Sequence, residues 1–165
     1  MTIFKLVAFT LAVSFAAPAF ADSPLGGYTS EVAGLYNKEA NSKGLKTHLE
    51  LSGCKNSDVV LCSYIGAGGV RIKAFSIENK ADLNFIMLTF GGKNSDDLVD
   101  LFAAINNVAK TYRPEITDSE VMNLLDRIGD SVQFHHDMKD FEIRNMRVSA
   151  MNSDVFGLVI LFGGA

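Results

Sequence analysis

The residues best suited to chemistry are His135, His136 and Asp137, which follow one another late in the chain. Imidazole and carboxylate groups are common zinc ligands and general acids or bases. Adjacent residues on a strand point to opposite faces, so the two histidines rarely share one ion. A zinc site would need a further ligand, such as His48 or a distant carboxylate. The cluster therefore supports an alternative hypothesis, a small metal-dependent enzyme or hydrolase, beside the simpler interpretation of two surface histidines.

Other catalytic patterns find little support in the sequence. Leu51-Ser52-Gly53-Cys54 lacks the first glycine of the G-x-S-x-G motif of serine hydrolases. Residues 66–69 are rich in glycine but are not followed by the Lys-Ser/Thr pair of a phosphate-binding loop, so they predict a hairpin turn. Three carboxylates crowd the start of a predicted helix, where the helix dipole favours acidic residues: Asp96, Asp97 and Asp100. The sequence therefore favours a non-enzymatic protein and predicts no cofactor.

The two cysteines, Cys54 and Cys62, predict one disulfide in an exported chain. The alternative is a redox or metal-binding pair, although the spacing is not the C-x-x-C of thiol oxidoreductases. The closed ring of nine residues would contribute about 2.5 kcal/mol by the loop-entropy relation. This is too little to replace a hydrophobic core, so we expect the bond to fix a local hairpin.

A candidate binding surface follows one turn later in the chain. Arg71 and Lys73 share one face of a predicted strand, and Phe75 and Ile77 continue that face. An exposed apolar patch beside basic residues is typical of a surface that binds a partner. The alternative is a β-bulge that returns Phe75 and Ile77 to the core.

The N-terminus has the pattern of a secretory signal peptide. Lys5 precedes an uncharged apolar stretch, residues 6–15, and Ala19-Phe20-Ala21 has the form of a signal-peptidase site. We therefore predict cleavage after Ala21, a signal peptide over residues 1–21 and a single domain over residues 22–165. The short signal predicts a bacterial periplasmic or secreted protein, with an uncleaved N-terminal anchor as the alternative.

The charge of the predicted domain limits its partners. Fifteen basic residues less Lys5 leave fourteen, against nineteen acidic residues, which gives a net charge of −5. Nucleic acids and anionic membranes require a basic face, so neither is expected as a partner. The 144 residues of this domain suffice for a core of its own.

Hydrophobic periodicity predicts an α+β fold with the element order α-ββββ-αα-ββ. Its parts are an antiparallel meander of four strands, helices packed mainly on one sheet face, and a C-terminal hairpin. The predicted helices cover residues 28–41, 95–111 and 118–128, with a capping box at Thr117–Glu120 and Gly129 just beyond the last helix. The predicted strands cover residues 45–52, 59–65, 70–77, 83–90, 141–151 and 155–162, the fifth of them bulged.

These observations predict an exported protein that binds rather than catalyses. Its site is expected on the sheet face or in a groove between helices and sheet, and its ligand is expected to be a protein or a small apolar molecule. A protein partner would be another envelope or secreted protein, and the sequence carries no information on the oligomeric state.

Overall fold

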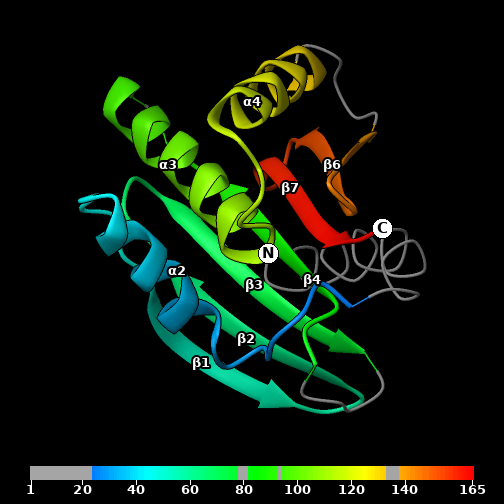
Figure 1. Cartoon of the computed structure of the whole chain (residues 1–165). Coiled ribbons are helices and arrows are strands. Elements are labelled where there is room, and N and C mark those ends of the chain that lie inside the picture. Colours follow the sequence, from blue (N-terminus) through cyan, green and yellow to red (C-terminus); the bar gives the residue numbers. More distant parts are fainter. Residues whose placement is uncertain (1–23, 78–81, 93, 133–137) are drawn as a thin grey trace.

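The computed structural model describes residues 24–77, 82–92, 94–132 and 138–165, which form an α+β fold (Figure 1). Its element order is α-ββββ-αα-βββ, as predicted except for one additional strand. The helices are α2 (Val32–Ser42), α3 (Ser95–Tyr112) and α4 (Asp118–Val132). The strands are β1 (Glu50–Asn56), β2 (Val59–Ile65), β3 (Val70–Ile77), β4 (Phe85–Phe90), β5 (Lys139–Ile143), β6 (Met146–Ser153) and β7 (Gly157–Gly164).

All seven strands form one antiparallel sheet in the order β1-β2-β3-β4-β7-β6-β5. The predicted meander β1–β4 makes one half, and β5–β7 make the other. The two halves join where β4 pairs with β7, and these strands are apolar on both faces. Strands of this kind must be shielded from water on both sides, which places them at the centre of the sheet.

The three helices cover one face of the sheet, which we call the helix face (Figure 1). Side chains of α2, α3 and α4 share one hydrophobic core with the inward residues of the strands. A second apolar cluster lies on the opposite, outer face; no residue of a described helix belongs to it. Its buried members are Phe75, Phe85, Met87, Val159 and Leu161.

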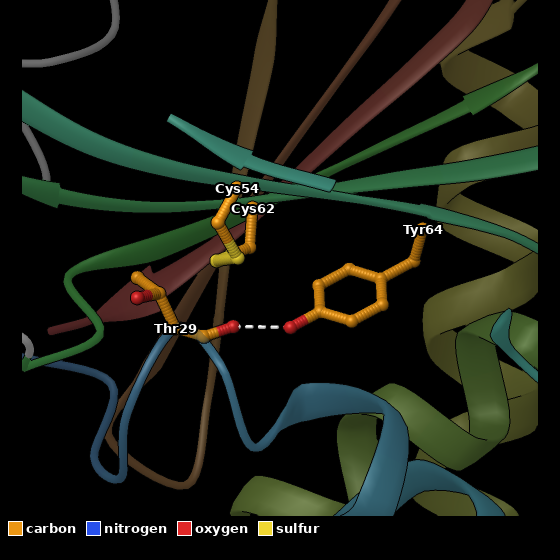
Figure 2. The surroundings of a disulfide bond; sticks show 4 residues. All are labelled: Thr29, Cys54, Cys62 and Tyr64. Atoms are coloured by element: carbon orange, nitrogen blue, oxygen red, sulfur yellow. Dashed lines mark hydrogen bonds between the residues drawn. A yellow bond between two sulfur atoms is a disulfide. The ribbon is translucent and has the colours of Figure 1, made fainter. Parts of the chain in front are cut away.

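The predicted disulfide is confirmed: Cys54 and Cys62 occupy paired positions of β1 and β2, with their Cα atoms 4.1 Å apart. Figure 2 shows that the bond lies near Tyr64, whose buried hydroxyl donates a hydrogen bond to the carbonyl oxygen of Thr29. Burial raises the pKa of Tyr64 to about 12, so its hydroxyl keeps the proton that it donates. The contact ties the segment before α2 to the sheet.

The first strand begins later than the alternating pattern of residues 45–52 predicts. At Leu49 the backbone forms its hydrogen bonds with the side chain of Asn37 and not with a neighbouring strand. The amide of Asn37 donates to the Leu49 carbonyl oxygen at 3.0 Å and accepts from the Leu49 N–H at 2.8 Å. Regular pairing starts only at Glu50, and the register shifts between Leu51 and Gly53. Leu51 is consequently exposed instead of buried with the core.

The predicted long strand over residues 141–151 is two strands, and the predicted bulge is a hairpin turn. Arg144 and Asn145 both have positive φ, 48° and 57°, and connect β5 to β6. Two consecutive residues in this conformation define the type I′ turn that suits the twist of a β-hairpin. The change in apolar parity between Ile143 and Met146 arises from this reversal of the chain.

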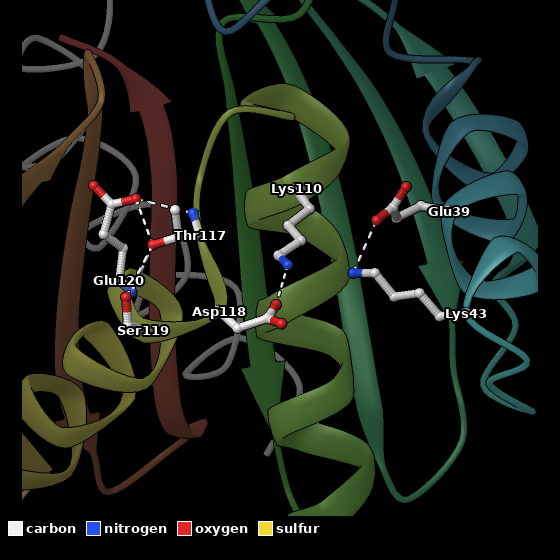
Figure 3. A network of polar contacts seen from close by, with 7 residues as sticks. All are labelled: Glu39, Lys43, Lys110, Thr117, Asp118, Ser119 and Glu120. Atoms are coloured by element: carbon white, nitrogen blue, oxygen red, sulfur yellow. Dashed lines mark hydrogen bonds and ion pairs between the residues drawn. The ribbon is translucent and has the colours of Figure 1, made fainter.

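Helix α4 starts at its predicted signal, whereas α2 starts at Val32, later than predicted and without a side-chain cap. Thr117 and Glu120 form a capping box, in which Thr117 Oγ1 accepts from the Glu120 N–H and Glu120 Oε2 accepts from the Thr117 N–H at 2.9 Å. Asn94 and Asp97 form a second one at the start of α3. Helix α4 continues through Gly129 to Val132, so the predicted stop at Gly129 is wrong. Figure 3 shows the polar contacts around the first turn of α4.

Replacing Tyr64 with phenylalanine tests the contact of Figure 2. The Tyr64→Phe variant leaves the buried Thr29 carbonyl without its partner, and we expect a loss of about 1–3 kcal/mol in the free energy of unfolding. The exposed Tyr28→Phe variant serves as the control and should change stability by less than about 0.5 kcal/mol. Urea unfolding measures both, and equal stability of the two variants would contradict the assignment.

The capping box of α4 predicts a dependence of stability on pH. The Thr117 N–H, Arg144 and the Thr117 hydroxyl donate to Glu120 and lower its pKa from 4.5 to about 2. A pKa that is lower in the folded state stabilises the fold above the unfolded value and loses this contribution as the pH falls toward 2. The urea midpoint of the native protein should therefore exceed that of Glu120→Gln at neutral pH, and the difference should shrink below about pH 4.5. A difference that stays constant down to pH 2 would refute this.

Candidate functional site

The strongest candidate site is a groove between α3 and α4, which we call the α3–α4 groove. Figure 1 shows that an extended connection joins the two helices and that they point in different directions. The groove has a volume of about 870 Å³. Its helical walls are Leu98, Leu101, Phe102 and Ile105 on α3, and Met122, Leu125, Asp126, Ile128, Gly129 and Asp130 on α4; its floor is Phe90, Gly92, Asn152, Gly157 and Leu158.

Large apolar side chains are exposed along both walls. Leu98 and Phe102, one turn apart on α3, are 44% and 48% exposed, and Met122 on α4 is 58% exposed. Deeper in the groove Leu101, Ile105 and Ile128 belong to the buried core, which holds the walls in place. Contiguous exposed apolar surface of this kind is typical of ligand grooves and protein interfaces.

Arg113 anchors the C-terminal end of α3 to two neighbouring segments. It caps the C-terminus of α3, and its guanidinium donates to the carbonyl oxygens of Leu25 at 3.2 Å, Arg144 at 3.0 Å and Asn145 at 2.9 Å. These carbonyls belong to the segment before α2 and to the β5–β6 turn. This rigid fork of donors fixes the end of α3, and hence of one groove wall, against both segments.

Ion pairs bind the turn more closely to the helices. The ammonium of Lys110 on α3 pairs with the carboxylate of Asp118 at the start of α4 (Figure 3). This pairing lowers the pKa of Asp118. Arg144 of the β5–β6 turn pairs with Glu120 at 2.8 Å. The helices are thus joined by polar contacts at their closed end and are separated by apolar side chains at their open end.

The four residues predicted as a binding patch do share one face of β3. The pairing of β3 with β2 and β4 runs without a bulge, so Arg71, Lys73, Phe75 and Ile77 all lie on the outer face. The expected exposure of Phe75 is wrong, since it is 2% exposed and stacks on Phe85 with ring centroids 4.5 Å apart. Ile77 is half-buried against the same cluster. Apolar side chains of β4 and β7 pack with Phe75, so it belongs to the outer apolar cluster.

The basic residues lie at one side of this outer cluster. Arg71 is exposed and Lys73 is half-buried beside it. Burial, followed by repulsion from Arg71 and Lys55, lowers the pKa of Lys73. The cations on this part of the outer face are thus Arg71 and Lys73 on β3 and Lys55 on β1. Phe75 and Ile77, the apolar residues that would complete a binding patch with these cations, are buried and half-buried.

The metal hypothesis concerns residues outside the described ranges. His135, His136 and Asp137 are among them, so the hypothesis stays a prediction. Among described residues no three His, Cys, Asp or Glu side chains are grouped to hold a metal ion. His48 is exposed, with its ring nitrogens 3.1 Å from the Lys46 carbonyl oxygen and 3.0 Å from the side-chain oxygen of Asn41.

The acidic cluster at the start of α3 has the structural role that the sequence predicts. Asp96 and Asp97 lie in the first turn, and the Asp97 carboxylate accepts a hydrogen bond from the Asn94 N–H in the capping box. Asp100 follows one turn later, next to Gly68 of the β2–β3 turn. We assign no catalysis to these carboxylates.

The sequence alone did not identify the groove. Leu98, Leu101, Phe102 and Ile105 form the predicted apolar stripe of α3, but a stripe does not show which of its members remain exposed. Met122 on α4 is exposed, which its residue type does not predict. The usable signal is that Phe102 directly follows Leu101, which makes the apolar stripe wider than one packing surface requires.

No protein family, curated protein or solved structure matches this chain. Within the part of the chain that the structure describes, no helix is long and apolar enough to cross a membrane.

Replacing Phe75 distinguishes a core residue from a residue of a binding patch. Loss of a buried ring leaves a cavity, so Phe75→Ala should lower the free energy of unfolding by about 3–5 kcal/mol. Ile65→Ala is the control, because Ile65 lies on the same face of β2 and is 54% exposed; it should cost less than about 1 kcal/mol. Denaturant unfolding measures both losses. Equal losses for the two variants would show that Phe75 is a surface residue.

Proposed function

We propose that this protein is an exported, non-enzymatic binding protein and that the α3–α4 groove is its binding site. The observation that carries the proposal is the exposure of Leu98, Phe102 and Met122 along the walls of a single groove of about 870 Å³. Pockets of roughly 300–1,000 Å³ with mostly apolar walls are the usual size of small-molecule sites. The same surface also suits an apolar segment of a protein, such as another envelope or secreted protein.

Export is part of this proposal, and two features support it. The first is the signal-peptide pattern of residues 1–21. The second is the disulfide between Cys54 and Cys62, since such bonds persist mainly in oxidising compartments. A periplasmic or secreted location would place the groove where it meets envelope proteins and extracellular ligands.

The groove is a better candidate than the outer sheet face. A site must be accessible before its ligand arrives, and the five central members of the outer cluster are buried. The side chains at the rim of the groove are already exposed. The Lys110–Asp118 ion pair joins α3 to α4, and Arg113 ties the end of α3 to neighbouring segments, so both walls are anchored before a ligand binds.

The fluorescent apolar dye N-phenyl-1-naphthylamine tests the proposal. We expect it to bind the protein, and Phe102→Asp and Met122→Asp to weaken binding about tenfold, because each removes buried apolar contact worth about 1.5 kcal/mol or more. Leu51→Asp and Ile65→Asp are matched controls at exposed apolar positions away from the groove and should have no effect. Dye titration of the folded variants measures this. If Phe102→Asp and Met122→Asp leave the affinity for the dye unchanged, the groove is not its binding site.

A further inference from the structure

We propose that the occupant of the α3–α4 groove is an amphipathic helix of a partner protein, with basic residues beside its apolar stripe. This inference rests on the proposed function and specifies the chemistry of the ligand. It follows from the shape of the two walls and from the charges at one end of them.

The two walls have the form that a third helix would pack against. Leu98 and Phe102 project from successive turns of α3 and form a ridge, and helices pack by placing such ridges in each other's grooves. On α4, Gly129 lines the groove, and apart from its chain neighbours and the backbone of its own helix no atom lies within 4 Å of the position that a Cβ would occupy there. A wall without a side chain at this point lets another helix approach closely. An apolar stripe with i, i+3, i+4, i+7 spacing fits such a groove.

The charges along α4 indicate which residues should flank that stripe. Met122, Asp126 and Asp130 lie on successive turns and line the groove, so its wall changes from apolar to acidic toward the C-terminus of α4. The C-terminal end of a helix carries negative partial charge and favours cations. The last turn of α4 contains no basic residue, and neither aspartate makes an ion pair with a described cation. Lysine or arginine of a partner would supply the missing positive charge.

The same charges disfavour the principal small ligands of an apolar groove. Fatty acids and most phospholipids carry a negative head group, which Asp126, Asp130 and the C-terminus of α4 would repel. A basic helix gains from the walls and from the acidic end together. Charge complementarity therefore selects it over an anionic amphiphile.

Two labelled peptides of about 18 residues, long enough for a stable helix, test the inference. One carries leucine at i, i+3, i+4, i+7 positions and lysine elsewhere; the other carries glutamate in place of lysine. Fluorescence anisotropy with the protein expressed from the full sequence measures binding. We expect the lysine peptide to bind, and the glutamate peptide to bind at least about tenfold more weakly. Palmitate should fail to displace the lysine peptide.

Variants separate the contributions of charge and apolar contact. Asp126→Asn with Asp130→Asn should weaken binding of the lysine peptide about fivefold at low salt and reduce its salt dependence. The matched control is Glu50→Gln with Asp58→Asn, which removes two exposed charges at the start of β1 and in the β1–β2 turn. It should change neither the affinity for the lysine peptide nor its salt dependence. Phe102→Ser, which removes the apolar contact without adding a charge that would attract lysine, should weaken binding about tenfold.

The outcomes distinguish this inference from the proposed function. If the dye binds in the groove but the lysine peptide does not bind, or binds no better than the glutamate peptide, the inference is wrong and the proposed function stands. An equal effect of the two double variants would also overturn it. If substitution of Phe102 changes neither the affinity for the dye nor the affinity for the lysine peptide, both proposals fail.

Discussion

The structure depends on one constraint, the apolar character of β4 and β7 on both of their faces. Each fully buried Leu, Ile or Phe side chain stabilises the fold by about 1.5–3 kcal/mol, so neither face can remain in water without a large cost. The helix face meets this requirement through the shared core of α2, α3 and α4. The outer face has a cluster of its own around Phe75 and Phe85. Because α3 and α4 must cover the sheet while diverging from one turn, apolar side chains remain exposed between them, and the groove results from this geometry.

Much of the fold follows from short-range patterns in the sequence. The capping box at Thr117–Glu120 and the apolar stripe of α3 specify their helices because both signals act within a few residues. The pairing of Cys54 with Cys62 follows from an even cysteine count and a short turn. The faces of β3 also follow from simple alternation, since no bulge interrupts its pairing.

The errors arise where a distant or unusual contact overrides a local pattern. Residues 45–52 alternate like a strand, yet the side chain of Asn37 binds the backbone of Leu49 and delays the strand. The turn at Arg144–Asn145 lacks the glycine that usually marks a type I′ turn, so its sequence resembles a continuous strand. The end of α3 is anchored by Arg113 to three carbonyls, from segments up to 88 residues away in sequence, and periodicity contains no information on such contacts.

The pairing of β4 with β7 has a consequence for how the chain folds. Strands β1–β4 and β5–β7 are each joined in sequence by short connections, whereas the β4–β7 seam closes a loop over residues 91–156 that includes both α3 and α4. Contacts between residues far apart in sequence form slowly because the entropy of loop closure opposes them. Until the seam forms, each half has a long apolar strand with unpaired backbone groups at its edge. The rate of this single docking step therefore determines how long the newly made chain is exposed to pairing with other chains.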